Sequence, residues 1–300
     1  MSKKIIQIIC YILAFAVFLA GLAIFLYPLA NRMLINHNTE ERLDGFRGVR
    51  EESIKTDIDE GKYSQLYYDM KSYNENIFEE GQQGLRDVWS YEQAGFDLSE
   101  YGVYNGIVAE LRIPKMDTKL PVYMGATTAN MAMGAAQMGQ TSAPIGGVNT
   151  NCVLAAHRGA AGGEFFLYIE RLEAGDKVYV DNLWETLTYT VVDIEIIQPD
   201  EISKVLIREG EDMLTLITCH PYPTNYQRYA VYCQRQETEQ DSTPPAQEES
   251  SSATYTQPTA ENKEKSSTFF INFELALYII IPILLLVLTI FLLIPKKRNK

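Results

Sequence analysis

Histidine and cysteine are scarce in this sequence, which has three histidines and four cysteines among its 300 residues. No two cysteines are separated by two residues and no two histidines by three, so the usual spacings of zinc ligands are absent. We therefore expect neither a metal nor a cofactor. Cys10 falls in an apolar run, which leaves three cysteines, and disulfide pairing cannot use up an odd number. An unpaired thiol with a distant histidine is typical of a nucleophile and its base.

Basic residues are also few. The chain has 26 lysines and arginines against 39 aspartates and glutamates, and its net charge is -13. A protein that binds nucleic acid presents a basic surface to the phosphates, so this composition argues against nucleic acid as a partner. Several of the basic residues lie at the chain ends, at 3–4 and 296–300, which makes the part between them still more acidic.

Two long apolar runs stand out, at 5–27 and 275–294. Each is long enough to cross the roughly 30 Å hydrocarbon core of a membrane as a helix. Basic residues flank the outer end of each run, and the positive-inside rule then places both termini in the cytoplasm. The first run is longer than a signal-peptide core and is followed by no clear cleavage site, so we interpret it as a retained anchor. The sequence thus predicts a two-pass protein of the cell membrane with residues 31–268 on the extracytoplasmic side.

Composition divides the chain into five segments. They are an N-terminal transmembrane anchor at 1–30, a helical segment at 31–103, a β-rich domain at 104–236, a tether at 237–268, and a C-terminal transmembrane helix with a basic cytoplasmic tail at 269–300. The tether is rich in Ser, Thr, Gln, Glu and Pro and has almost no large aliphatic residues. Such a composition cannot bury enough apolar surface to order itself, so we expect a disordered linker.

Hydrophobic periodicity distinguishes the two central segments. In the helical segment, apolar residues at helical spacing form one face: Tyr63, Leu66, Tyr67, Met70, Tyr73 and Ile77. In the β-rich domain, short β-branched and aromatic runs are separated by turn residues: 107–113, 119–123, 151–156, 177–180, 185–197, 213–218 and 229–233. The spacing of these runs predicts an all-β barrel or sandwich.

Strand alternation sorts the reactive side chains of the β-rich domain. Cys152 and His157 are five residues apart, so a regular strand sends them to opposite faces. The same parity separates Arg228 from Cys233. If His157 and Arg228 face a cleft, Cys152 and Cys233 face away from it as small buried hydrophobes. Cys219 ends an apolar run and enters a turn, which is where an exposed nucleophile is usually placed.

Three blocks of this domain resemble the His, Cys and Arg motifs of sortases, in the same order and at similar intervals. They are 154–159 (Leu-Ala-Ala-His-Arg-Gly), 215–219 (Thr-Leu-Ile-Thr-Cys) and 225–231 (Asn-Tyr-Gln-Arg-Tyr-Ala-Val). Two further blocks, 111–114 and 139–147, resemble the start of the family's barrel and the stretch before its histidine strand. The resemblance implies a closed eight-stranded β-barrel, with short helices, for this domain.

The resemblance also implies a reaction. Sortases cut a Leu-Pro-x-Thr-Gly-like sorting signal between Thr and Gly. Cys219 would attack the Thr carbonyl, and His157 would protonate the leaving Gly amine and later deprotonate an incoming amine. Arg228 stays cationic and could hydrogen-bond the substrate carbonyl or the developing oxyanion. The substrates would be pilin or surface proteins with C-terminal sorting signals, at a Gram-positive-type envelope.

Two anchors with a helical segment before the barrel resemble the class C sortases, which polymerise pilins by joining the signal to a lysine amine. Those enzymes usually carry a lid with an Asp-Pro-aromatic signature. Here Asp87-Val88-Trp89 lies about where that signature belongs, with valine where proline is common. By resemblance, Asp87 would bond Arg228, and the Trp89 ring would cover the sulfur of the nucleophile. These two residues are therefore the candidate lid.

Alternatives stay open at this point. A housekeeping-type sortase would pass the signal to a cell-wall peptide amine instead of a lysine. A catalytically silent, membrane-tethered binding module and a thiol redox protein are possibilities of other classes. His220, directly after Cys219, could tune the thiolate, but we interpret it as a solvated turn residue.

Overall fold

The structure is a computed structural model that describes residues 3–87, 89, 96–159, 163–222 and 224–236. Contacts divide the chain into two units, and residues 31–242 form the second of them. The described part of the first unit is the start of helix α1, up to Ala30. The tether and the second apolar run predicted at 275–294 lie outside the described residues, so both remain predictions.

Helix α1 (Lys3–Ser53) contains the first apolar run and continues beyond it. Near the N-terminus it is long and apolar enough to cross a membrane. Apolar side chains there, such as Ile12 and Ile24, are exposed, which is what a lipid-facing helix requires. One candidate span is therefore present among the described residues.

The last turns of α1 belong to the second unit and pack into its core. Leu43 and Phe46 are fully buried, and Phe46 belongs to the main hydrophobic core. The Arg47 guanidinium donates from Nε and Nη2 to the two carboxylate oxygens of Glu110, at 2.8 and 2.6 Å. Glu110 is 3% exposed, so this bidentate pair neutralises a buried charge and fixes the end of α1 to a strand.

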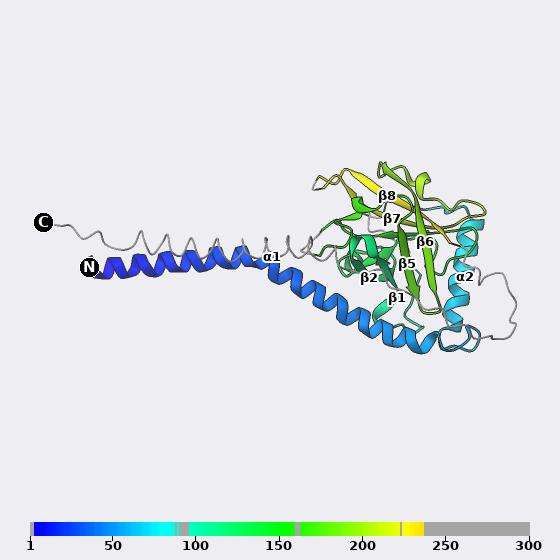
Figure 1. Cartoon of the computed structure of the whole chain (residues 1–300), viewed down its shortest axis with the longest axis horizontal. Coiled ribbons are helices and arrows are strands. Elements are labelled where there is room, and N and C mark those ends of the chain that lie inside the picture. Colours follow the sequence, from blue (N-terminus) through cyan, green and yellow to red (C-terminus); the bar gives the residue numbers. More distant parts are fainter. Residues whose placement is uncertain (1–2, 88, 90–95, 160–162, 223, 237–300) are drawn as a thin grey trace, which may run out of the picture. The chain divides into compact units, whose positions relative to one another are not determined.

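Helix α2 (Ser64–Glu79) forms where the apolar periodicity predicts a helix. It buries Leu66, Met70 and Ile77, and the first two join the same core as the barrel interior. Figure 1 shows α2 beside the barrel strands. Tyr63, at the N-terminal end of the predicted apolar face, is the residue that precedes the helix and is also buried.

The β-rich domain is a closed barrel of eight strands among the described residues, as the resemblance implied. The strands are β1 (Ile107–Ile113), β2 (Thr118–Met124), β3 (Ala135–Gln137), β4 (Thr150–Ala155), β5 (Lys177–Asn182), β6 (Thr186–Ile197), β7 (Asp212–His220) and β8 (Gln227–Arg235). Their order is β1-β2-β3-β4-β7-β8-β6-β5, and β5 pairs with β1 to close the barrel. The short helices are α3 (Thr128–Met131), η2 (Tyr104–Gly106), η3 (Pro114–Met116), η5 (Ile169–Arg171) and η6 (Ile202–Val205).

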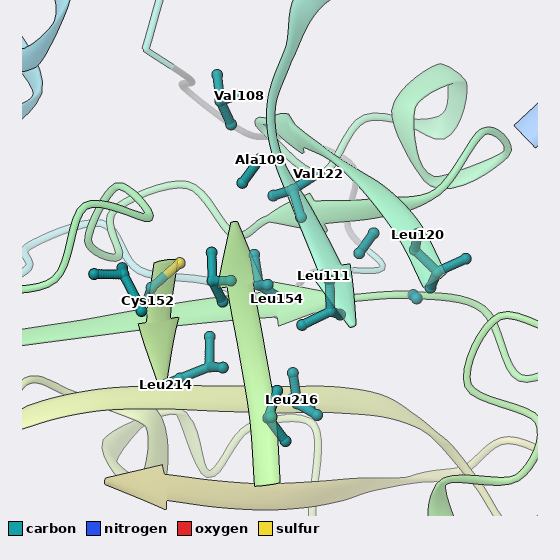
Figure 2. Close-up of a cluster of buried hydrophobic side chains, with 14 of the residues drawn as sticks. Val108, Ala109, Leu111, Leu120, Val122, Cys152, Leu154, Leu214 and Leu216 are labelled. Atoms are coloured by element: carbon teal, nitrogen blue, oxygen red, sulfur yellow. The ribbon is translucent and has the colours of Figure 1, made fainter. Parts of the chain in front are cut away.

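Alternation along β4, β7 and β8 separates two apolar clusters. Cys152, Leu154, Leu214 and Leu216 belong to the main core, and Figure 2 shows them gathered with residues of β1 and β2. Residues that alternate with them along the strands, including Val153 and Ile217, join a second cluster, which also contains Leu85 from the segment after α2. We call this second cluster the outer face. Each strand therefore has one side in the barrel and the other on the outer face.

Candidate active site

The register of three neighbouring strands brings His157, Cys219 and Arg228 to one level of the barrel. Strands β4 and β7 are parallel, and their last pair is Ala155 opposite Ile217. His157 and Cys219 each come two residues after that pair. On the next strand, Arg228 lies directly opposite Cys219 in antiparallel register, so their Cβ atoms are about 5 Å apart. Sequence-distant residues thus meet at the ends of β4 and β7 and the start of β8.

The outer face is the side on which these residues gather. Ala155, Ile217 and Ala230 belong to the outer face, and alternation puts Cys219 and Arg228 on that side of their strands. Thr218, which alternates to the other side, donates its hydroxyl to the Ala156 carbonyl at 2.7 Å. That bond ties the ends of β4 and β7 together and fixes the position of the thiol.

Arg228 is held by the segment that precedes the barrel. Its Nε and Nη2 donate to the two carboxylate oxygens of Asp87 at 2.9 and 2.8 Å, and its Nη1 donates to the carbonyls of Asn225 and Gln227. The Trp89 ring covers the guanidinium, with 4.5 Å between the guanidinium carbon and the ring centroid. The contact found for Trp89 is therefore with the arginine, whereas the resemblance implied a position over the sulfur.

Asp87 and Trp89 belong to a segment that is anchored on the outer face. We call residues 82–87 together with Trp89 the cover segment. Gln82 donates from Nε2 to the Gln140 carbonyl at 2.8 Å and accepts from the Ile207 N–H at 2.6 Å. Leu85 is 5% exposed within the outer-face cluster. The cover segment therefore lies across the face to which Cys219 and Arg228 project.

Burial raises the pKa of the candidate nucleophile. Cys219 is only 8% exposed, and this burial raises the pKa of its thiol to about 11. The charges of Arg228 and Arg158 oppose that rise, and the Asp87 carboxylate adds to it. Burial also lowers the pKa of the half-buried His157 imidazole. Both changes favour a neutral thiol beside a neutral imidazole rather than the reactive ion pair.

His220 corrects one expectation. It is not a solvated turn residue: its side chain is 16% exposed and lies in a charged cluster with Arg158 and Glu170. Arg158 Nη1 is 2.9 Å from His220 Nδ1, and Arg158 Nη2 is 2.7 Å from a Glu170 oxygen. The His220 ring also contacts the Tyr229 ring, with centroids 5.6 Å apart. Arg158 and Glu170 were missed because nothing in the local sequence around Cys219 indicates partners from another segment.

Cys152 and Cys233 are free, buried thiols, as the parity argument predicted. Both lie opposite Leu214, one on each side of β7. Two strand spacings of about 4.8 Å put their Cα atoms beyond the reach of a disulfide. Burial raises the pKa of each thiol, so neither is a reactive thiolate. Among the described residues no group of three or more His, Cys, Asp or Glu side chains is placed to hold a metal ion.

Comparison with known proteins agrees with this geometry. Residues 111–236 match the family model of the sortase domain. The chain is 31% identical over 125 residues to Sortase A of Bacillus anthracis, which covers 42% of this chain and 58% of that protein. The chain thus spans less than two thirds of the length of that curated relative. Among solved structures it is similar to Sortase C1 of GBS Pilus Island 1, with a TM-score of 0.59 and 26% identity over 67% of this chain and 99% of that one. It is also similar to Sortase C of Streptococcus pneumoniae, with a TM-score of 0.56 and 27% identity over 65% and 97% of the two chains.

Proposed function

We propose that this chain is a sortase-type cysteine transpeptidase with Cys219 as its nucleophile, because residues 111–236 match the sortase domain and the curated relative is named a sortase. The observation that carries the proposal is the register of β4, β7 and β8, which puts a thiol, an imidazole and a guanidinium at one level. A buried structural cysteine would not need two such partners. Nucleophile, proton carrier and cation are the three groups that acyl transfer requires.

In the first half of the reaction, the Cys219 thiolate attacks the Thr carbonyl carbon of a Leu-Pro-x-Thr-Gly-like signal. The carbonyl oxygen becomes an oxyanion, and Arg228 donates hydrogen bonds to it. When the intermediate collapses, the C–N bond to Gly breaks. The His157 imidazolium gives its proton to the leaving amine, and a thioester remains on Cys219.

In the second half, an amine attacks the thioester carbonyl and passes a proton to the His157 imidazole. The carbon–sulfur bond breaks, and the Cys219 thiolate and His157 imidazolium are restored. The net change replaces one amide bond by another, so neither an oxidant nor a metal is needed. The amine that enters decides the biological product.

We assign the entering amine to a pilin lysine, which makes the product an isopeptide-linked fibre. The support is the cover segment: Asp87 bonds Arg228 as the class C resemblance implies for a lid, and the Trp89 ring covers the same guanidinium. The similar structures include a sortase of a pilus island and one described for its pilin substrate specificity. The curated relative, by contrast, is named Sortase A. A cell-wall peptide amine is therefore the second candidate acceptor.

The proposed setting is a membrane of a Gram-positive-type envelope, with the barrel on the extracytoplasmic side. Helix α1 supplies one anchor by its length and composition. A second anchor at 275–294 stays part of the proposal. Substrates that carry a C-terminal sorting signal would then meet the barrel near the membrane surface from which they emerge.

The test uses the full chain in detergent micelles, with Leu-Pro-x-Thr-Gly peptides and two competing acceptors. One acceptor is a peptide with a central lysine, and the other is a short glycine peptide that presents only its terminal amine. Mass spectrometry reads the covalent adduct on Cys219 and then the transfer products. Because Asp87 and Trp89 cover the arginine, the variant with Asp87→Ala and Trp89→Ala is run in parallel.

An adduct that is absent in Cys219→Ala and passes to lysine is the expected result. Cys152→Ala is the matched control, because it removes a buried thiol outside the site and should leave the adduct unchanged. Transfer to the glycine amine alone would replace the pilin assignment by the cell-wall one. No adduct in the uncovered variant, with Cys219 still open to a small alkylating reagent, would refute transpeptidation of this signal class.

A further inference from the structure

A second arginine contacts His220, the residue after Cys219, on the side of the strands away from the cover segment. His220 and Tyr229 follow Cys219 and Arg228 in sequence, so alternation turns them to the opposite side of β7 and β8. Tyr229 packs against the main core rather than the outer face. Arg158, the residue after His157, reaches His220 on that side at 2.9 Å.

The contacts of Arg158 hold its charge in a fixed place. Its side chain is 6% exposed, and Nη2 pairs with the Glu170 carboxylate at 2.7 Å. Nη1 lies against His220 Nδ1, and since a guanidinium can only donate, that nitrogen must accept. The backbone of Arg158 also forms a β-bridge with Phe165. Main chain and side chain are thus both fixed, and the guanidinium is buried.

We propose that Arg158 is a positioning residue of the transpeptidase, held by Glu170 and His220, whose charge supports the ionised form of Cys219 from the side opposite Arg228. The inference rests on the proposed function, because it concerns the nucleophile of that reaction. Arg158 is distinct from the three residues that touch the reacting atoms. It acts through the sulfur's ionisation and through the position of the strand end that carries it.

Arg228 and Arg158 differ in the carboxylate that each one pairs with. Arg228 faces the cover segment, where the Asp87 carboxylate bonds it at 2.8 and 2.9 Å and opposes its effect on the thiol. Arg158 faces Glu170, whose side chain is 51% exposed, so solvent screens that carboxylate more strongly than the buried guanidinium. The charged groups of the described residues that act on Cys219 are therefore Arg228 and Asp87 on one side and Arg158 on the other, and the titratable His157 lies at the level of the thiol at the end of β4.

The opposite charges within the Arg158–Glu170 pair give a test that a purely structural role would fail. Arg158→Gln removes the cation, and the ionisation of Cys219 should move to higher pH by about one unit, which is about tenfold less thiolate at a given pH. Glu170→Gln removes the anion and keeps the cation. It should move the ionisation in the reverse direction, by about two- to threefold in thiolate because Glu170 is half-exposed.

The measurement is the alkylation rate of Cys219 as a function of pH, with the full chain in micelles and the modified peptide identified by mass spectrometry. Arg171→Gln is the matched control: it removes the same charge one residue from Glu170, and Arg171 is exposed and stacks on Tyr168. It should leave the profile unchanged. Arg158→Lys keeps the charge and should restore most of the shift caused by Arg158→Gln.

Shifts of opposite sign for Arg158→Gln and Glu170→Gln support the inference. Shifts of the same sign, or none, overturn it, because loosening the cluster would then be the only effect. If Arg158→Gln does not fold, Glu170→Gln alone still tests the inference. A lower pKa of the Cys219 thiol in that variant requires a nearby cation whose effect Glu170 had offset. Alkylation needs no peptide substrate, so a failure of transpeptidation is read separately from a failure of this inference.

Discussion

The carboxylate of the cover segment offers the sharpest perturbation of the nucleophile. Asp87→Asn removes one negative charge but keeps a side-chain oxygen that can still accept from Arg228. The cover segment would then stay in place, anchored by Gln82 and Leu85. The substitution therefore isolates the effect of charge from the effect of access.

The expected magnitude follows from the geometry. Asp87 is within 3 Å of Arg228, which is the cross-strand neighbour of Cys219, so the carboxylate lies roughly 7 Å from the sulfur. At an effective dielectric constant of 20 to 40, a unit charge at that distance contributes about 1 to 2 kcal/mol. Near the middle of this range the effect equals about one pKa unit, or tenfold in thiolate.

The starting point is a thiol whose pKa is raised to about 11. At pH 8 such a thiol is ionised in about one molecule in a thousand, and Asp87→Asn should bring this to about one in a hundred. The pKa is lowered, so the alkylation profile moves to lower pH while its slope stays the same. Burial, the largest cause of the raised pKa, remains.

The assay is the alkylation rate of Cys219 between pH 6 and 10 in the full chain, read by mass spectrometry of the modified peptide. Asp97→Asn is the control, because it removes an exposed charge that does not act on the thiol. The added substitution Trp89→Ala should raise the rate further by opening access. An unchanged or slower rate for Asp87→Asn would refute the electrostatic reasoning.

Three further outcomes follow from contacts elsewhere. Arg47→Met leaves the Glu110 carboxylate buried without its partner and should lower the free energy of unfolding, measured in denaturant, by about 2 kcal/mol. The cost is not larger because Arg47 is itself partly exposed. Cys152 and Cys233 should stay unmodified by a thiol reagent under native conditions and react only after unfolding, as peptide mapping can show. Gln82→Ala removes two anchors of the cover segment and should speed alkylation of the nucleophile severalfold.

The two substitutions each have a matched control. Lys55→Met breaks an exposed ion pair with Glu51, at the C-terminal end of the helix that carries Arg47, and should cost less than about 0.5 kcal/mol. Gln65→Ala removes an exposed hydrogen bond to Asp69 on α2 and should not change alkylation of the nucleophile. If Lys55→Met destabilised the chain as much as Arg47→Met, burial of the glutamate could not be the reason for the cost.

Most of the barrel was predictable because its strands alternate strongly. The run at 107–113 coincides with β1, and the other six runs each overlap a strand. Strand β3 was missed since Ala135–Gln137 has three residues, two of them alanine, and carries no β-branched signal. Its place in the sheet depends on pairing with β2 and β4, which a local pattern does not contain.

The site was partly predictable for a related reason. Parity alone separated the buried Cys152 and Cys233 from the side of Arg228, because alternation is a local property of a strand. The partner of His220 was not predictable, since Arg158 and Glu170 come from the segment after β4 and meet it only in the barrel. The position of Trp89 over Arg228 likewise depends on how the cover segment crosses the outer face.

The pairing of β7 and β8 explains how the Cys219 thiol can be buried and still lie near a fixed cation. Consecutive residues point to opposite sides, so Cys219 meets Arg228 and the cover segment on one side while His220 meets Arg158 on the other. A change in the cover segment alters burial and the Asp87 charge without disturbing the second side. The cation at Arg158 then persists whether or not the cover is in place. Uncovering should therefore lower the pKa of the Cys219 thiol with no rebuilding of the site, because the strand end and one of its two cations are already fixed.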